Sequence, residues 1–153
     1  MKTVIDIRPA RGDEAGLLSG LAFRSKAHWG YDEAFLEACR PALTLRPDEL
    51  GARRATVAEA RGTVVGFYTL DCTPPVGELD NLWVEPAGMG DGVGRRLWAH
   101  AMATAAASGL TEVLIEADPY AEGFYLAMGA ERIGTVPSTV TPGRLLPRMR
   151  YRP

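Results

Sequence analysis

Four alternating glycines constrain this chain more than any other feature of its sequence. They are Gly88, Gly90, Gly92 and Gly94, after Pro86, and the residues that follow, 95–107, are rich in alanine and leucine. Glycine adopts backbone conformations that other residues avoid, and it costs entropy where that freedom is not used. The pattern therefore predicts a strand, a tight loop and a helix, with backbone N–H groups that approach an anion. The alternative is a loop that only connects the strand to the helix.

Two familiar nucleotide-binding motifs do not match this loop. The dinucleotide pattern G-x-G-x-x-G lacks its third glycine, because Val93 and Arg95 stand where it would fall. The pattern G-x-x-x-x-G-K-[ST] needs a lysine, and the only lysines are Lys2 and Lys26. The favoured ligand is a phosphate or pyrophosphate on the amides of residues 90–95, at the positive end of a helix that begins near Val93.

Hydrophobic patterns and turn residues predict an α+β arrangement for the rest of the chain. Short apolar or alternating runs predict strands, and a strand on each side of the 95–107 helix forms a β-α-β crossover. Aspartates before apolar periodic segments predict three further helices. The expected strands are 4–8, 56–59, 63–70, 78–84, 113–115, 132–133 and 148–151, and the expected helix caps are Asp13, Asp32 and Asp118.

Composition predicts one soluble globular domain, residues 1–153. Of the residues, 46% are apolar and 24% are charged, and 17 basic against 19 acidic side chains leave a net charge of −2. That balance does not suit a protein that binds nucleic acid by neutralising phosphates. The first nine residues carry Asp6 and Arg8, and no stretch reaches the length of a membrane span, so we expect a cytoplasmic protein with no membrane contact.

Cysteine and histidine usage gives no sign of a metal centre. Cys39 and Cys72 show neither a C-x-x-C spacing nor nearby histidines, and His28 and His100 lie far apart in the sequence. We therefore expect reduced, structural thiols and no bound metal.

Residues 82–97 resemble the signature of the GNAT superfamily of acyl-CoA N-acyltransferases. In that family a strand ends in Val-x-Pro, a loop (Arg/Gln)-x-x-Gly-x-(Gly/Ala) follows, and a helix begins. Residues 118–130 are similar to a later helix of the family, with a Phe/Leu-Tyr pair followed by glycine. The resemblance implies a mixed, mostly antiparallel sheet of about six to seven strands with helices on both faces. Met89 and Asp91 depart from the loop pattern, and Asp118 replaces the usual asparagine.

The resemblance also implies a function. Acetyl-CoA would be the cofactor, and its acetyl group would pass directly, with no covalent enzyme intermediate, to a primary amine of a small molecule or a peptide. The alternative is a non-catalytic acyl-CoA-binding or sensor domain, which the departures in the loop keep open. The residues expected to hold the cofactor are Leu82, Trp83, Val84, Met89, Gly90, Asp91, Gly92, Val93, Gly94, Arg95, Asp118, Ala121 and Phe124.

Three residues are candidates for the proton transfers. Tyr125 corresponds to the family's tyrosine near the sulfur and is expected to protonate the departing thiolate. Glu78, aided by Asp80, is expected to accept the proton of the amine. The alternatives are a tyrosine packed in the core beside Phe124 and two solvated strand carboxylates.

The acceptor site is less defined. Trp29 and Tyr31 lie in an aromatic break between two predicted helices, where the family builds a substrate wall, and they pack in the core in the alternative interpretation. Arg144, in a segment expected to cover the site, is either a ligand for a carboxylate on the acceptor or a solvated charge. A homodimer is a further expectation, because dimers are common in the resembling family.

Overall fold

Seven strands form one sheet, in the order β1-β2-β3-β4-β5-β7-β6, in a computed structural model that describes residues 4–153. Residues 1–3 of the expected domain lie outside the described residues. Every neighbouring pair is antiparallel except β4 and β5, which confirms the predicted mixed sheet. The strands are β1 (Asp6–Pro9), β2 (Thr56–Ala60), β3 (Thr63–Asp71), β4 (Val76–Val84), β5 (Glu112–Glu116), β6 (Glu131–Pro137) and β7 (Leu145–Tyr151).

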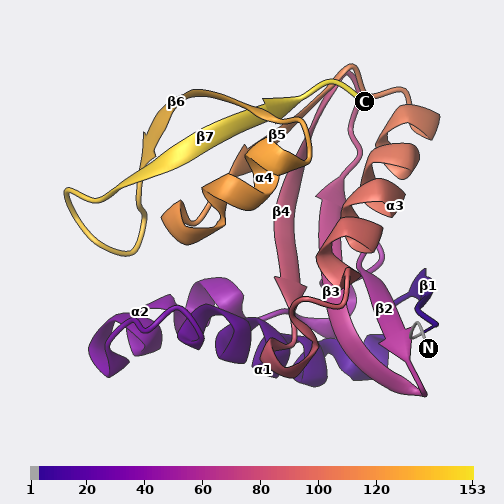
Figure 1. Ribbon diagram of the computed structural model, residues 1–153, viewed down its shortest axis with the longest axis horizontal. Helices are drawn as coiled ribbons and strands as arrows, with labels where there is room; N and C mark the ends of the chain where they lie inside the picture. Colours follow the sequence, from indigo (N-terminus) through magenta and orange to yellow (C-terminus); the bar gives the residue numbers. More distant parts are fainter. Residues whose placement is uncertain (1–3) are drawn as a thin grey trace.

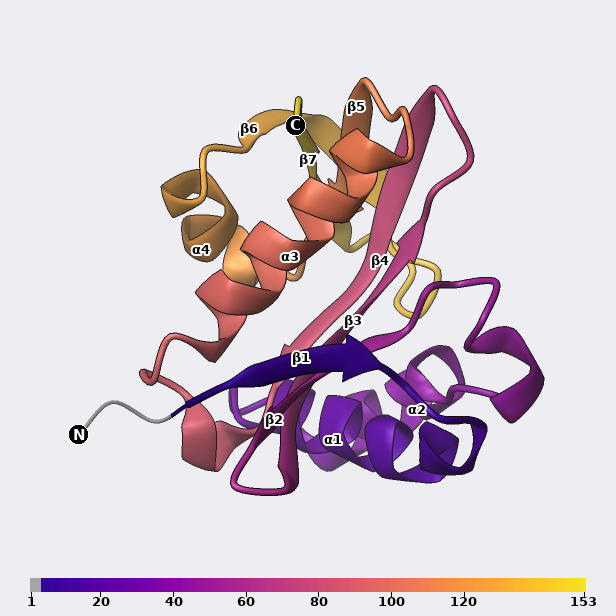
Figure 2. The ribbon, with the colours of Figure 1, turned by 90° about the vertical axis from the view of Figure 1, so that its right-hand side faces the viewer.

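Helices cover both faces of this sheet, as expected. The first two lie on one face and the last two on the other (Figures 1 and 2). Single 3-10 turns precede α1 and α4 and open the loop before α3. The helices are α1 (Ala15–Ala27), α2 (Glu33–Leu43), α3 (Val93–Ala107) and α4 (Glu122–Ala127).

Alternation along the strands divides the apolar side chains between two cores. On the face of α1 and α2, Val57 and its cross-strand partner Phe67 are fully buried with Leu18 and Leu21 of α1. Their neighbours Ala58 and Tyr68 point to the other face and pack with Leu97 and the rest of α3. Because successive strand residues face opposite sides, β2 and β3 serve both cores at once.

The predicted helix starts are correct in part. Asp32 caps α2, since its side chain accepts a hydrogen bond of 2.8 Å from the amide of Phe35. The prediction for Asp13 is wrong, because this residue lies within a 3-10 turn and its carboxylate binds the Arg11 guanidinium instead of a backbone amide. Asp118 caps a 3-10 turn rather than an α-helix, so the predicted helix from Pro119 begins only at Glu122.

β4 and β5, the one parallel pair of the described sheet, separate after a short paired segment. β4 and β5 pair only over residues 76–78 and 112–114, so Leu79–Val84 has no partner strand on the β5 side. On the β3 side, Thr69 pairs with Asn81 and Leu70 with Leu79, which leaves Asp80 as the extra residue of a β-bulge. The glycine loop, α3 and α4 lie around this opening (Figure 2).

Candidate functional site

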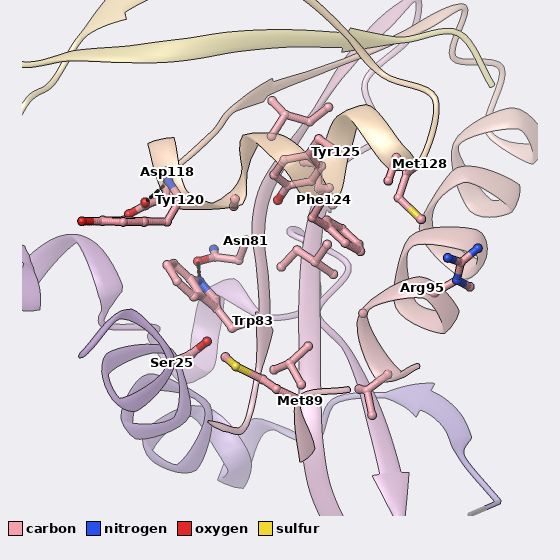
Figure 3. A pocket seen from close by; sticks show the side chains of 18 of the residues that line it. Ser25, Asn81, Trp83, Met89, Arg95, Asp118, Tyr120, Phe124, Tyr125 and Met128 are labelled. Carbon is pink, nitrogen blue, oxygen red and sulfur yellow. Dashed lines mark hydrogen bonds between the residues drawn. The ribbon is translucent and has the colours of Figure 1, made fainter. Parts of the chain in front are cut away.

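A cavity of about 520 Å³ occupies the opening between β4 and β5. Figure 3 shows its wall, with Asp118 and Tyr120 at one end and Arg95 at the other. Most of the residues that the sequence indicates for cofactor binding line it: Leu82, Trp83, Val84, Met89, Gly90, Gly92, Val93, Gly94, Arg95, Asp118, Ala121 and Phe124. Asp91 does not line the cavity and is exposed to solvent.

The glycine loop presents a group of free amides to this cavity. Gly90 and Gly92 have φ values of +93° and +80°, a region that L-residues with a side chain rarely adopt. Gly92 is the N-cap of α3 and provides no side-chain acceptor, so the first amides of the helix have no partner in the loop. Within residues 4–153, no protein acceptor binds the amides of Gly90, Gly92, Val93, Gly94 or Arg95.

At Gly94 the backbone of α3 lies close to α4 and to β4. A Cβ added there would lie 3.4 Å from Cε2 of Phe124 and 3.6 Å from Cγ2 of Val84, so any larger side chain would enter the space between these two cavity residues. The structure therefore leaves an open cradle of N–H groups at the positive end of a helix dipole. Such a cradle suits a phosphate or pyrophosphate.

Tyr125 is a buried residue whose hydroxyl group reaches the cavity. The residue is only 6% exposed and packs against Trp98 and Phe124. Its hydroxyl points into the cavity (Figure 3) and has no hydrogen-bond partner among the described residues. Burial, together with the charge of Asp118, raises the pKa of this phenol above its ordinary value. The group therefore stays protonated at neutral pH, as a proton donor must.

The two candidate carboxylates occupy different positions. Asp80, in the bulge, lines the cavity, whereas Glu78 does not and forms an ion pair of 3.3 Å with Arg148. The Asp80 carboxyl is accessible from the cavity, but the protein around it removes part of its hydration and raises its pKa to about 6. Arg53 opposes this rise, and the Glu78 carboxyl adds to it by repulsion and hydrogen bonding.

Of the three candidate acceptor residues, Trp29 lies apart from Tyr31 and Arg144, which contact each other. Trp29 lines the cavity and stacks on Tyr120, with ring centroids 5.5 Å apart. The hydroxyl of Tyr31 donates to Asp118 and accepts a hydrogen bond of 2.6 Å from Arg144. Arg144 does not line the cavity but lines a smaller pocket of about 170 Å³ beside it.

Several cavity residues were not predicted from the sequence. The buried amide of Asn81 donates to Thr69 and accepts from the indole of Trp83, each at 2.8 Å, which fixes the orientation of Trp83 beside the cavity. An amide side chain between the apolar residues of a predicted strand and its two carboxylates was the available signal. Glu116 follows a predicted buried strand, and Tyr120 stands two residues after a predicted cap. The residues missed are Ser25, Leu79, Asn81, Gly88, Ile115, Glu116, Tyr120, Ala127 and Met128.

Two features of other functional classes are absent from residues 4–153. No group of three or more His, Cys, Asp or Glu side chains is arranged there to hold a metal ion. None of the helices in this part of the chain has both the length and the apolar character needed to cross a membrane.

Solved structures with the same architecture are numerous. A GCN5-related N-acetyltransferase from Rhodopseudomonas palustris superposes with a TM-score of 0.84 at 21% identity, covering 99% of this chain and 98% of that one. The PaiA N-acetyltransferase of Thermoplasma acidophilum, solved with coenzyme A, gives 0.76 at 19% identity, with 97% and 99% covered. YjaB from Escherichia coli gives 0.74 at 24% identity, with 97% of each chain covered. At these identities the likeness shows the fold.

The family is shown by the sequence itself. A search of curated proteins finds no match to this chain. The model of the Acetyltransferase (GNAT) family matches residues 22–130, which is more than half of the chain and includes the glycine loop, α3 and α4. The fold agrees with that match. The chain therefore belongs to the GNAT family of acetyltransferases.

Proposed function

We propose that this protein is an acetyl-CoA-dependent N-acetyltransferase that transfers an acetyl group directly to a primary amine of a small molecule or a peptide. The observation that carries the proposal is that one cavity contains both the amides of residues 90 and 92–95 and the hydroxyl of Tyr125, none of which has a protein partner within residues 4–153. An anion cradle and a proton donor are both needed for transfer from a CoA thioester to an amine.

The cavity residues fit acetyl-CoA, which supplies an activated acetyl thioester when bound. The amides of residues 90–95 would bind the pyrophosphate, since backbone donors at a helix N-terminus need no basic side chain. Arg95 adds a positive charge at that end. The edge of Leu82–Val84 that lacks a partner strand would pair with the amides of the pantetheine arm, as an added strand does. Asp118, Ala121 and Phe124 complete the wall.

Two residues would move protons in this cavity. Asp80 is the base in the proposal, because its carboxyl faces the cavity and a pKa of about 6 leaves it deprotonated at neutral pH yet basic enough to accept a proton. Glu78 acts on it through charge, since Glu78 helps raise that pKa. Tyr125 is the acid, because its phenol holds a proton that a departing thiolate can take.

The proposal also places the protein in the cytoplasm. Cys39 and Cys72 are both free, and burial raises the pKa of the Cys39 thiol, so this cysteine is an unreactive core residue. Unpaired structural thiols are typical of a reducing compartment.

Two measurements test the function. Acetyl-CoA at saturating concentration should raise the melting temperature, and thiol release should accelerate with some member of a panel of amino acids, polyamines, aminoglycosides and peptide amino termini. Stabilisation without thiol release from any amine would support a non-catalytic acyl-CoA sensor. Absence of both responses would contradict any cofactor-dependent function.

A further inference from the structure

A second pocket adjoins the main cavity on the side of the β6–β7 turn. Its volume is about 170 Å³, and it shares Trp83, Glu116 and Asp118 with the main cavity. We call it the side pocket. The remaining wall comes from α1, α2 and residues 138–146, and in Figure 1 the turn between β6 and β7 lies over α2. The side pocket is therefore a neighbour of the space in which the acceptor amine would react, and the two share three wall residues.

Arg144 gives the side pocket a positive charge that no carboxylate neutralises within residues 4–153. Its guanidinium donates one hydrogen bond, to the hydroxyl of Tyr31 at 2.6 Å, and takes part in no ion pair there. It lies over the rings of Tyr31 and Phe35, at 5.1 and 4.7 Å from their centroids. Two aromatic faces and one hydrogen bond hold the group in place while most of its five N–H donors remain available.

Two of the other charges that line the side pocket, those of Lys26 and Asp118, cancel. Lys26 forms an ion pair of 2.8 Å with Asp118, and both side chains are nearly buried. The Tyr31 hydroxyl donates to the same carboxylate, and burial together with Asp118 raises the pKa of Tyr31 to about 12, so the phenol stays neutral. Lys26 and Asp118 thus sum to zero, and the charge of Arg144 remains.

The main cavity and the wall that it shares with the side pocket carry negative charge, opposite in sign to Arg144. Arg148 is shared between Glu116, at 3.1 Å, and Glu78, at 3.3 Å, so these three side chains keep one negative charge. Asp80 adds another when it is deprotonated. Glu116 lines both spaces. A ligand that extends from the main cavity into the side pocket would therefore meet carboxylates where its amine would react and the guanidinium of Arg144 in the side pocket.

Resting on the proposed function, we infer that the acceptor is an amine that also carries a carboxylate, and that Arg144 in the side pocket binds this carboxylate. A guanidinium held by Tyr31 and Phe35 can accept a carboxylate through two parallel hydrogen bonds. The carboxylate belongs either to a free amino acid or to a short peptide, and both present the same chemistry.

The test compares matched acceptors. Thiol release from acetyl-CoA is measured with the common L-amino acids and their carboxamides, and with dipeptides and their carboxamides, using wild-type protein and Arg144→Met, Arg144→Lys and Arg46→Met. Arg46 is a matched control, because it is 69% exposed and lines neither space. The amino-acid and dipeptide arms distinguish the two sources of the carboxylate.

We expect at least one acid to be acetylated with a kcat/KM about tenfold or more above that of its amide. Arg144→Met should lower kcat/KM for the acid about 10- to 100-fold, mainly through KM, and leave kcat/KM for the amide unchanged. Arg144→Lys should give a kcat/KM for the acid between those of the wild type and Arg144→Met. Comparing the acid-to-amide ratio between variants removes differences in intrinsic reactivity. Arg46→Met should keep the wild-type ratio, and melting temperatures verify that each variant is folded.

Three results would overturn the inference while leaving the proposed function intact: amides acetylated as well as acids, equal effects of Arg144→Met on both, or turnover confined to amines without a carboxylate. Stabilisation by acetyl-CoA with no acetylation of any carboxylate-bearing amine would also overturn it. Failure of acetyl-CoA to bind at all would instead overturn the proposed function, and the inference with it.

Discussion

The hydroxyl of Tyr31 donates a hydrogen bond of 2.9 Å to the carboxylate of Asp118, although the two residues are 87 positions apart in the chain. Lys26 binds the same carboxylate at 2.8 Å. These contacts join α1 and the segment before α2 to the turn that precedes α4, across the place where β4 and β5 separate. Asp118, buried in the wall between the main cavity and the side pocket, thus links these three segments through its hydrogen bonds.

Removal of Lys26 should show how much its ion pair with Asp118 contributes to the stability of the fold. Lys26→Met leaves the Asp118 carboxylate buried without its cation, so we expect a loss of about 3 kcal/mol in the free energy of unfolding. The double variant Lys26→Met with Asp118→Asn should recover part of that loss, because the orphaned charge is gone. Urea unfolding of both variants measures this, and a loss below about 0.5 kcal/mol for Lys26→Met would show that the pair is energetically unimportant.

Acid should destabilise the protein through Glu14. Two hydrogen bonds of 2.9 Å from Arg8 and one of 2.8 Å from the Arg11 amide reach this buried carboxylate, and Arg8 above all lowers its pKa from 4.5 to about 2. A depressed pKa in the folded state stabilises the protein above pH 4.5, and this contribution is lost as pH falls from there towards 2.

We therefore expect Glu14→Gln to cost about 2–3 kcal/mol at pH 7 and progressively less towards pH 3. Glu37→Gln is the control. It removes a carboxylate from the exposed pair with Arg40 and should leave stability nearly unchanged at every pH. Urea titrations across this pH range check the trend. A cost for Glu14→Gln that does not depend on pH would contradict the linkage.

The positive φ of Gly92 should matter for the cofactor as well as for stability. Gly92 and Gly109 have φ values of +80° and +84°, and nothing lies within 4 Å of a Cβ at either. Alanine at either position should cost about 1 kcal/mol of stability. Only Gly92 lines the cavity. Titration calorimetry should show acetyl-CoA affinity falling about tenfold for Gly92→Ala and unchanged for Gly109→Ala. Equal affinities would remove the loop from the binding site.

Asp80 should set the lower limit of the pH range for activity. As the base it must be deprotonated, so kcat/KM should rise with pH through an apparent pKa of about 6. Asp80→Asn should lower kcat/KM and abolish its rise with pH near 6. Glu78→Gln should move this rise to lower pH, because it removes a neighbour that raises the Asp80 pKa. The same rise of kcat/KM with pH in Asp80→Asn would exclude Asp80 as the base.

The loop and the helix after it were predictable because their causes are local. Alternating glycines and an alanine-rich run specify a turn and a helix without help from distant residues, and α3 begins at Val93 as expected. The cap at Asp32 is local in the same way. The bulge at Asp80 and the pairing of Glu78 with Arg148 depend on strands that are distant in sequence, so no pattern near residue 80 indicates them. The contacts between Tyr31 and both Asp118 and Arg144 have the same origin.

The most direct test of the proposed mechanism is the single-turnover rate of Tyr125→Phe beside its equilibrium affinity for acetyl-CoA. Tyr151→Phe is the matched control, because Tyr151 also packs against Trp98 but does not line the cavity. Loss of the proton donor should slow acetyl transfer about 100-fold while the affinity stays within about twofold of wild type. The control should match wild type in both quantities. An unchanged rate in Tyr125→Phe would contradict the assignment of Tyr125 as the acid.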